Sequence, residues 1–152
     1  YLAATSSSFY GYFGGGYSPT TISTITRLDF SNETISDPGK NLPTARYGLA
    51  SVSSSTYGYF GGGTLPPYIS TISRLDFSNE TVSDPGNNLP TARGLSAATS
   101  SSSYGYFGGG FFTPIIYINT ISRLDFSNET TSDPGKNLPT ARGDLAAVSN
   151  SN

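Results

Sequence analysis

The sequence predicts an all-β protein, and three observations carry that prediction. A long segment occurs three times, marked by RLDFSNET at Arg27, Arg74 and Arg123, with spacings of 47 and 49 residues. Within each copy, short stretches rich in Thr, Tyr, Ile and Phe are separated by turn signals such as Asp-Pro-Gly. No segment has the 3.6-residue apolar period of a helix.

Each copy divides into four short strands, as the second copy illustrates. The predicted strands are GLASVSSS from Gly48, TYGYFGG, ISTISRLDF over 69–77, and ETVS from Glu80. The last strand ends at DPGNNLP, where proline lacks the amide donor that a central strand needs.

Four strands in about 47 residues are typical of one blade of a β-propeller. The predicted units are 1–46, 47–93 and 94–142, and 143–152 reads as the opening strand of a further blade. Propellers have about four to eight blades. We therefore expect these residues to be part of a longer repeat chain or, as the less favoured alternative, copies to join head to tail and close the edges.

The units resemble kelch repeats. The resemblance rests on strand openings at Arg46 and Arg93, on YFGGG in place of a glycine doublet, and on RLDFSNET where kelch units carry an acidic turn. It covers nearly the whole chain, but Ile35, Val82 and Thr131 replace the tryptophan that usually follows that turn. The texture of YFGGG also resembles repeats in tail-fibre-like proteins of cyanobacterial viruses.

The run YGYFGGG begins at Tyr10, Tyr57 and Tyr104. A phosphate-binding loop would need a following Lys and Ser/Thr or a helix start, and neither follows. We therefore expect the glycines to permit close packing. In a propeller we expect the second strand to lie deep in the blade, where neighbouring blades converge on the axis. Gly14 and Gly15 would let the backbones approach there, and Tyr12 and Phe13 would fill the wedge between blades.

The composition excludes several classes of function. Charged residues make up 12% of the chain, the net charge is -2, and no basic run occurs, which argues against nucleic acid or an anionic membrane as partner. Cys and His are both missing. We therefore expect no catalytic site, cofactor or metal; the aspartates of the SDPG turns (Asp37, Asp84 and Asp133) read as turn residues rather than calcium ligands.

The units differ mainly in the segments after the glycines: YSPTT, TLPPY and FFTPIIY. Apolar residues on variable loops suggest external contacts, to a sugar or protein surface. The alternative is that they pack back onto the propeller. The candidate binding residues are Tyr17, Tyr68, Phe111, Phe112, Ile115, Ile116 and Tyr117.

Two repeated polar patterns allow structural or functional readings. Asn32, Asn79 and Asn128 lie in Asn-Glu-Thr, the acceptor pattern for N-glycosylation, although Asn also suits turns that require positive φ. Two residues apart in a strand, Arg27 and Asp29 share a face, as do their counterparts Arg74 with Asp76 and Arg123 with Asp125.

We expect these pairs to form an ion-pair ladder between blades. The candidate partners of Asp29 and Glu33, or of their equivalents, are Arg46, Arg93 and Arg142.

The sequence thus predicts a non-catalytic, extracellular structural or adhesive module, such as a fibre or virion-surface component. Its expected partners are further blades or copies of itself, and carbohydrate or protein surfaces. The alternative is a kelch-type adaptor whose loops capture a protein. A glycan-processing enzyme would require unlike acidic residues from outside this segment.

Overall fold

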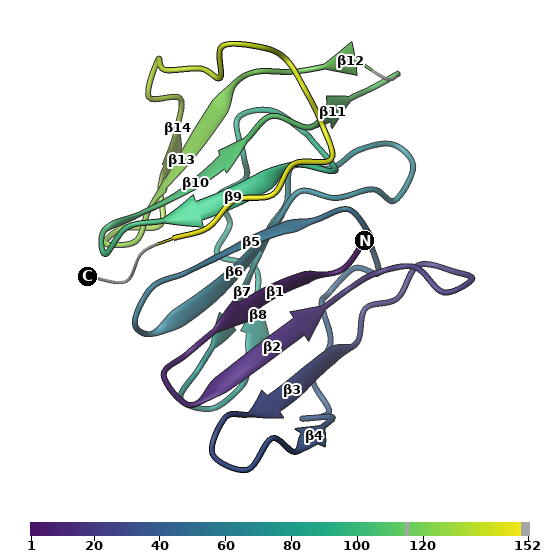
Figure 1. The fold of residues 1–152 in the computed structure, drawn as a ribbon, viewed down its shortest axis with the longest axis vertical. Coiled ribbons are helices and arrows are strands. Elements are labelled where there is room, and N and C mark those ends of the chain that lie inside the picture. The colour runs from purple at the N-terminus through teal and green to yellow at the C-terminus, as the bar shows by residue number, and fades with distance from the viewer. Residues whose placement is uncertain (115, 150–152) are drawn as a thin grey trace.

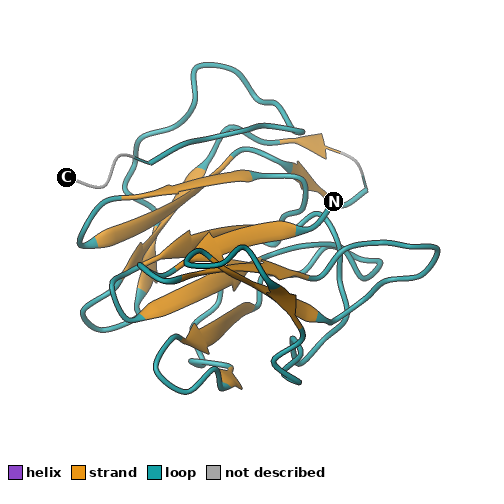
Figure 2. Ribbon diagram, turned by 60° about the horizontal axis from the view of Figure 1, so that its bottom comes forward, coloured by secondary structure: helices purple, strands orange, loops and turns teal. Residues whose placement is uncertain are grey.

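Each sequence unit folds into one four-stranded antiparallel sheet in the computed structural model, which describes residues 1–114 and 116–149. No helix occurs in these residues (Figure 2), so the described part contains none that could cross a membrane. The predicted all-β class and four-strand units are confirmed. The strands of sheet 1 are β1 (Ala3–Ser6), β2 (Tyr10–Gly14), β3 (Ile25–Asp29) and β4 (Ile35–Ser36).

The other two sheets repeat this order, and a small hairpin is added in the third unit. Sheet 2 contains β5 (Ala50–Ser53), β6 (Tyr57–Gly61), β7 (Ile72–Asp76) and β8 (Val82–Ser83). Sheet 3 contains β9 (Ala97–Ser100), β10 (Tyr104–Gly108), β13 (Ile121–Asp125) and β14 (Thr131–Ser132). The hairpin consists of β11 (Phe111–Phe112) and β12 (Ile116–Tyr117).

The strand register is the same in all three sheets. The central tyrosine of the second strand pairs with the arginine of the third, as in Tyr12 with Arg27 and Tyr59 with Arg74. Because side chains alternate across a strand, this register sends the same residue types to the same face of each sheet.

The first strands, β1, β5 and β9, lie side by side where the sheets meet (Figure 1). Thr5 Oγ1 donates to the Val52 carbonyl at 3.3 Å, and Ser51 Oγ donates to the Ala4 carbonyl. The expectation that the second strand lies where the blades converge was therefore wrong. The small residues of the first strands allow these strands, rather than the aromatic second strands, to approach most closely.

The segments that join the units are linked to one another by backbone hydrogen bonds. Gly48 N donates to Tyr1 O at 2.7 Å, Leu95 N to Gly48 O at 2.7 Å, and Asp144 N to Leu95 O at 2.9 Å. Gly48, Leu95 and Asp144 all have positive φ, at 63°, 54° and 54°. Backbone hydrogen bonds therefore hold each connecting segment in position against the connecting segment of the next unit.

The hydrophobic core consists of two clusters, each shared by neighbouring sheets. The first contains Ala3, Tyr12, Ile25, Leu42, Leu49, Phe60 and Leu75, and the second contains Ala50, Val52, Tyr59, Ile72, Leu89, Phe107 and Leu124. Since each cluster draws side chains from two units, a single sheet cannot bury its apolar residues alone.

The glycine runs serve close packing, as predicted. A Cβ at Gly14 would lie 2.9 Å from the Phe60 ring, and one at Gly61 would lie 2.7 Å from the Phe107 ring. Gly15 has φ +68°, and its Cβ would lie 2.6 Å from the Arg46 carbonyl oxygen. The aromatic ring of one sheet thus fills the space that the glycine of the preceding sheet leaves.

The segment after Arg142 forms no strand over its described part, 143–149. It runs beside β9 (Figure 1), and Thr99 Oγ1 donates to the Val148 carbonyl at 2.7 Å. The equivalent contact between sheets 1 and 2 joins Thr5 to Val52. Residues 143–149 therefore lie where the first strand of another sheet would, and no second strand pairs with them within the described part of the chain. Residues 150–152, also in the predicted strand, lie outside the described residues.

Gly15→Ala should lower the free energy of unfolding by about 3 kcal/mol, because it combines a left-handed backbone with a steric clash against backbone. The matched control is Gly39→Ala. Gly39 has φ +71° but no atom within 4 Å of its Cβ position, so only the conformational cost of about 1 kcal/mol applies. Urea unfolding of both variants measures the difference, and equal losses would contradict the packing role.

Candidate functional site

The variable loops of the three units lie at one end of the molecule, on the right in Figure 1, opposite the turns that join first and second strands. They follow β2, β6 and β10, and in the third unit the loop forms the β11–β12 hairpin. All three variable segments therefore lie on the same side of the molecule.

Four of the candidate binding residues have exposed side chains. The exposed fractions are 57% for Tyr17, 41% for Phe112, 52% for Ile116 and 54% for Tyr117. Leu65, which the sequence analysis did not single out, is 40% exposed on the second loop. The signal for it was its position in TLPPY, a variable segment.

Two other candidates pack within the protein. Phe111 is 7% exposed and lies against Tyr117, with ring centroids 4.4 Å apart. Tyr68 is half-buried beside Gly94, where a Cβ would meet its ring at 2.8 Å. Phe111 and Tyr68 therefore follow the alternative prediction, that loop residues pack back onto the repeated sheets. Ile115 lies outside the described residues, and a binding role of the exposed side chains stays a prediction.

A tyrosine cluster adds a residue that the sequence analysis missed. Tyr47 lies between Tyr17 and Tyr1, with ring centroids 5.5 Å and 5.9 Å away. Its backbone also pairs with Thr64 of the second loop. The available signal was that the other units have glycine at this position, Gly94 and Gly143.

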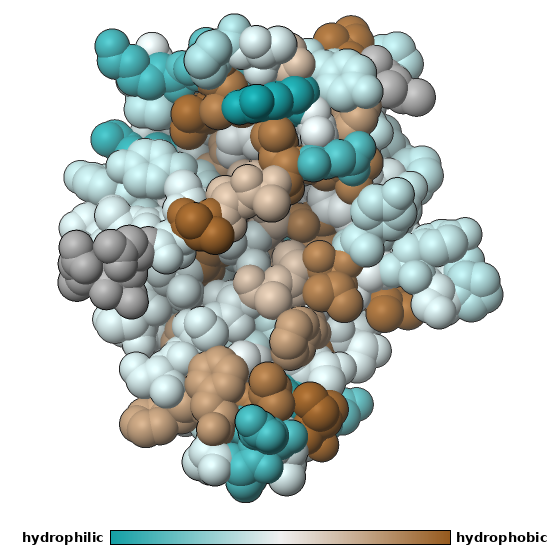
Figure 3. Space-filling view, in the orientation of Figure 1, coloured by the Kyte–Doolittle hydropathy of each residue, from teal (hydrophilic) through white to brown (hydrophobic). Residues whose placement is uncertain are grey.

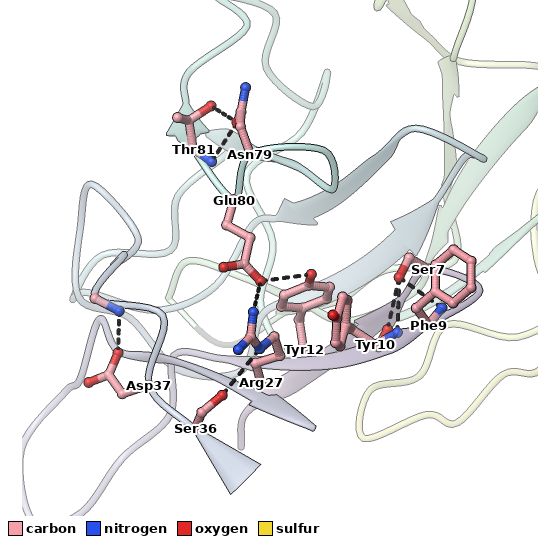
Figure 4. A network of polar contacts seen from close by, with 11 residues as sticks. Ser7, Phe9, Tyr10, Tyr12, Arg27, Ser36, Asp37, Asn79, Glu80 and Thr81 are labelled. Atoms are coloured by element: carbon pink, nitrogen blue, oxygen red, sulfur yellow. Dashed lines mark hydrogen bonds and ion pairs between the residues drawn. The ribbon is translucent and has the colours of Figure 1, made fainter. Parts of the chain in front are cut away.

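An ion pair joins each sheet to the next, as Figure 4 shows for sheets 1 and 2. Arg27 NH1 lies 2.9 Å from Glu80 Oε1, and Tyr12 OH donates to the same oxygen at 3.1 Å. Arg74, Tyr59 and Glu129 repeat this arrangement between sheets 2 and 3. Burial and the hydrogen bond to Glu80 raise the pKa of Tyr12 well above its usual value.

The predicted ladder of ion pairs therefore exists, but its partners were assigned wrongly. Glu80 pairs with Arg27 of the preceding sheet, not with Arg93. Asp29 instead accepts hydrogen bonds from Ser31 N and Ser31 Oγ at 2.8 and 2.6 Å, within its own turn. Because the acidic turn of one unit reaches the third strand of the preceding unit, the in-register repeat alone could not identify the partner.

The arginines of the NLPTAR segments are buried among main-chain carbonyl groups. Arg46 is 1% exposed, and NH2 donates to Phe60 O at 3.0 Å and to Ser73 Oγ at 2.9 Å. Arg93 is fully buried and donates to the Phe107, Gly109 and Thr120 carbonyls.

Burial lowers the pKa of Arg46 and of Arg93 to about 10, so both guanidinium groups stay charged at neutral pH. Their assignment as partners of Asp29 and Glu33 was therefore wrong. Arg142, the third member, is exposed.

The Asn-Glu-Thr turns have a structural explanation. Asn32 Oδ1 accepts from Thr34 N at 3.0 Å and from Thr34 Oγ1 at 2.7 Å, and the two later units repeat both bonds. The positive φ falls on the following glutamates, Glu33, Glu80 and Glu129, not on the asparagines as expected. The spacing of Asn and Thr is thus accounted for by turn geometry, and the exposed asparagines stay candidate acceptors.

The remaining polar groups give no sign of a metal centre in the described residues. No three His, Cys, Asp or Glu side chains gather there, and Asp37 Oδ1 accepts from Gly39 N at 2.7 Å as a turn residue. Hydrophobic side chains form a broken band across the face seen in Figure 3, between hydrophilic ones.

Comparison with known proteins assigns the chain to no family. Neither the models of protein families nor the curated proteins include a match to the chain. Functional inference therefore rests on the repeated sheets and their loops.

Glu80→Ala should lower the free energy of unfolding by about 2 kcal/mol, because it leaves the buried Tyr12 hydroxyl and Arg27 without their shared acceptor. The matched control is Glu33→Ala, which changes the same residue type at nearly the same φ, 59° against 58°, on an exposed turn. Chemical unfolding of both in dilute solution measures the effect. Similar losses would show that the turn conformation, rather than the ion pair, matters.

Acid should weaken the fold through the three aspartate turns. Hydrogen bonds, first from the Ser31 hydroxyl and then from its amide, hold the pKa of Asp29 below its ordinary value of 3.8, and Asp76 and Asp125 behave alike. This stabilisation is fully present above the ordinary value and is lost as pH falls through the lowered pKa.

Melting temperatures between about pH 6 and about pH 2 should therefore fall less in a Ser31→Ala, Ser78→Ala, Ser127→Ala variant than in the unaltered chain. An unchanged acid dependence would exclude these hydroxyls as the cause.

Proposed function

We propose that the chain is a non-catalytic structural and adhesive module of kelch-like β-propeller type, working outside the cell or on a virion surface. The observation that carries the proposal is the contrast between two parts of the molecule. The docking contacts between sheets repeat almost residue for residue, whereas the exposed aromatic and aliphatic residues lie on loops that differ between units.

Several features support a structural rather than an enzymatic role. Tyrosine, arginine and glutamate are used in the contacts between sheets, in the same way twice. The aspartates of the turns accept hydrogen bonds from their own loops. This leaves the repeated polar residues committed to the fold, while function on a repeat scaffold commonly resides in the loops.

The loop end favours a ligand with both apolar and hydroxyl-bearing faces. Tyr17, Phe112, Ile116 and Tyr117 offer flat or branched apolar surface with few charges nearby. Aromatic side chains combine a large contact area with, in tyrosine, a polar end. A polysaccharide or a weakly charged protein surface has matching chemistry.

The proposal predicts that the loop residues mediate adhesion. Immobilised neutral polysaccharides and protein-coated surfaces should retain the chain, and replacing Phe112, Ile116 and Tyr117 by Ser should reduce retention at least about tenfold, since such exposed anchors dominate contact energies. The melting temperature should stay close to that of the unaltered chain. Biolayer interferometry and thermal unfolding provide the two readouts.

Phe111→Ser is the matched control, because this ring is buried beside the exposed ones. It should lower the melting temperature instead. Retention that is unaffected by the three exposed substitutions, or no retention on any such surface, would contradict the adhesive role.

A further inference from the structure

The contact between neighbouring sheets has two different halves, and the molecule uses the same contact twice. One half is a hollow on the leading face of a sheet, bounded in sheet 1 by Tyr12, Gly14, Ile25 and Leu42. The other half, on the following sheet, is an aromatic ring with a nearby glutamate. Phe60 fills the hollow of sheet 1, and Phe107 that of sheet 2.

Sheet 3 presents the same hollow without an aromatic ring in it. A cavity of about 160 Å³ is lined there by Tyr106, Gly108, Ile121 and Leu138, the equivalents of the residues in sheet 1. A Cβ at Gly108 would have its nearest contacts at 3.7 and 3.9 Å, both to side chains of its own unit. At Gly14 the ring of Phe60 lies 2.9 Å away.

Sheet 1 presents the complementary half on its opposite face. Phe13, the equivalent of the fully buried Phe60 and Phe107, is only half-buried. Phe30 is 49% exposed, whereas its equivalents Phe77 and Phe126 stack on Tyr12 and Tyr59 at 5.5 Å.

The charges at these two faces are complementary as well. Arg123 lies over the Tyr104 ring at 4.8 Å and forms no ion pair among the described residues, whereas its equivalents Arg27 and Arg74 pair with Glu80 and Glu129. Glu33 is exposed, while its equivalents Glu80 and Glu129 bind an arginine and a tyrosine of the preceding sheet. The repeated contact thus identifies what each face is built to receive.

We propose that the open face of sheet 3 binds the open face of sheet 1 in a second copy of this chain. Phe13 of the second copy fills the hollow beside Gly108, and its Glu33 binds Arg123 and Tyr106. The biological purpose of this self-association rests on the proposed structural function. The evidence for the self-association itself comes only from the contacts between neighbouring sheets.

Arg142 contributes a third contact in this arrangement. Its equivalent Arg46 donates to Phe60 O and Ser73 Oγ of the following sheet. The corresponding acceptors on the second copy are Phe13 O and Thr26 Oγ1, because Phe13 pairs with Thr26 as Phe60 does with Ser73. The exposed guanidinium of Arg142 becomes buried when the copies join.

The docked copy requires part of the segment after Leu145 to move. Residues 146–149 lie where β1 of the second copy must lie, and both segments have nearly the same sequence, AAVS and AATS. β1 is paired with β2 through four residues, whereas 143–149 form no strand. We therefore expect β1 of the second copy to displace residues 146–149 from their position beside β9.

A charge-reversal experiment tests the proposal. Sedimentation velocity of the unaltered chain at increasing concentration should show complexes of at least two copies. Glu33→Arg and Arg123→Glu should each weaken association at least about tenfold, since each places like charges together. Mixed in equal amounts, the two variants should associate again, because every contact between unlike copies then joins opposite charges.

Restored association in the mixture also shows that both variants are folded. A chain that stays at 15.9 kDa at all concentrations would overturn the proposal, and would leave the two faces to units of one longer polypeptide. Variants that associate like the unaltered chain, or a mixture that does not recover, would overturn it equally.

Phe112→Ser is the matched control, because this exposed residue lies on the β11–β12 hairpin and does not line the cavity beside Gly108. It should leave association unchanged. Conversely, Glu33→Arg should leave retention on polysaccharide or protein surfaces unchanged, so failure of the self-association proposal is distinguishable from failure of the adhesive role.

Discussion

The arrangement of the sheets depends on a buried guanidinium group between each pair of neighbours. Arg46 and Arg93 lie almost wholly inside the protein, and neither forms an ion pair with a carboxylate. The desolvation cost of such a group is offset only if its donors are met by acceptors in the right places. Main-chain carbonyls and the Ser73 or Ser122 hydroxyl accept from the terminal nitrogens, while Nε of Arg46 has no acceptor among the described residues. The backbone of one unit must therefore follow a fixed course around the side chain of the segment before it.

This constraint explains several features of the composition together. The third strand carries a small hydroxyl residue, Ser73 in sheet 2, which accepts a hydrogen bond from the guanidinium group of Arg46. The second strand of the same sheet carries Phe60, whose ring packs against Gly14 of the preceding sheet. The arginine carbonyl itself accepts from Gly16 N or Gly63 N. The contacts between sheets need few charged residues, which is compatible with the low content of charged residues in the chain. Each charged side chain between two sheets has a defined partner there, a carboxylate for Arg27 and Arg74 and main-chain carbonyls for Arg46 and Arg93.

The sequence predicted the units and their strands well because both depend on local patterns that occur three times. Gly14 and Gly15 could be assigned to close packing because no phosphate-binding context surrounds them. The partner of Glu80 could not be predicted, since in-register repeats do not distinguish a contact within a unit from one between units. The burial of Phe111 beside the exposed Phe112 depends on the hairpin that forms there, which the letters FF do not reveal.

The third unit has two more residues than the others between its YGYFGGG run and its RLDFSNET segment, and the loop there forms the β11–β12 hairpin without altering the strand register. Length changes at this end are therefore uncoupled from the contacts that hold the sheets together. Such a scaffold can vary the length and sequence of each loop while the packing between its sheets is preserved, which makes the three loop positions structurally independent of one another.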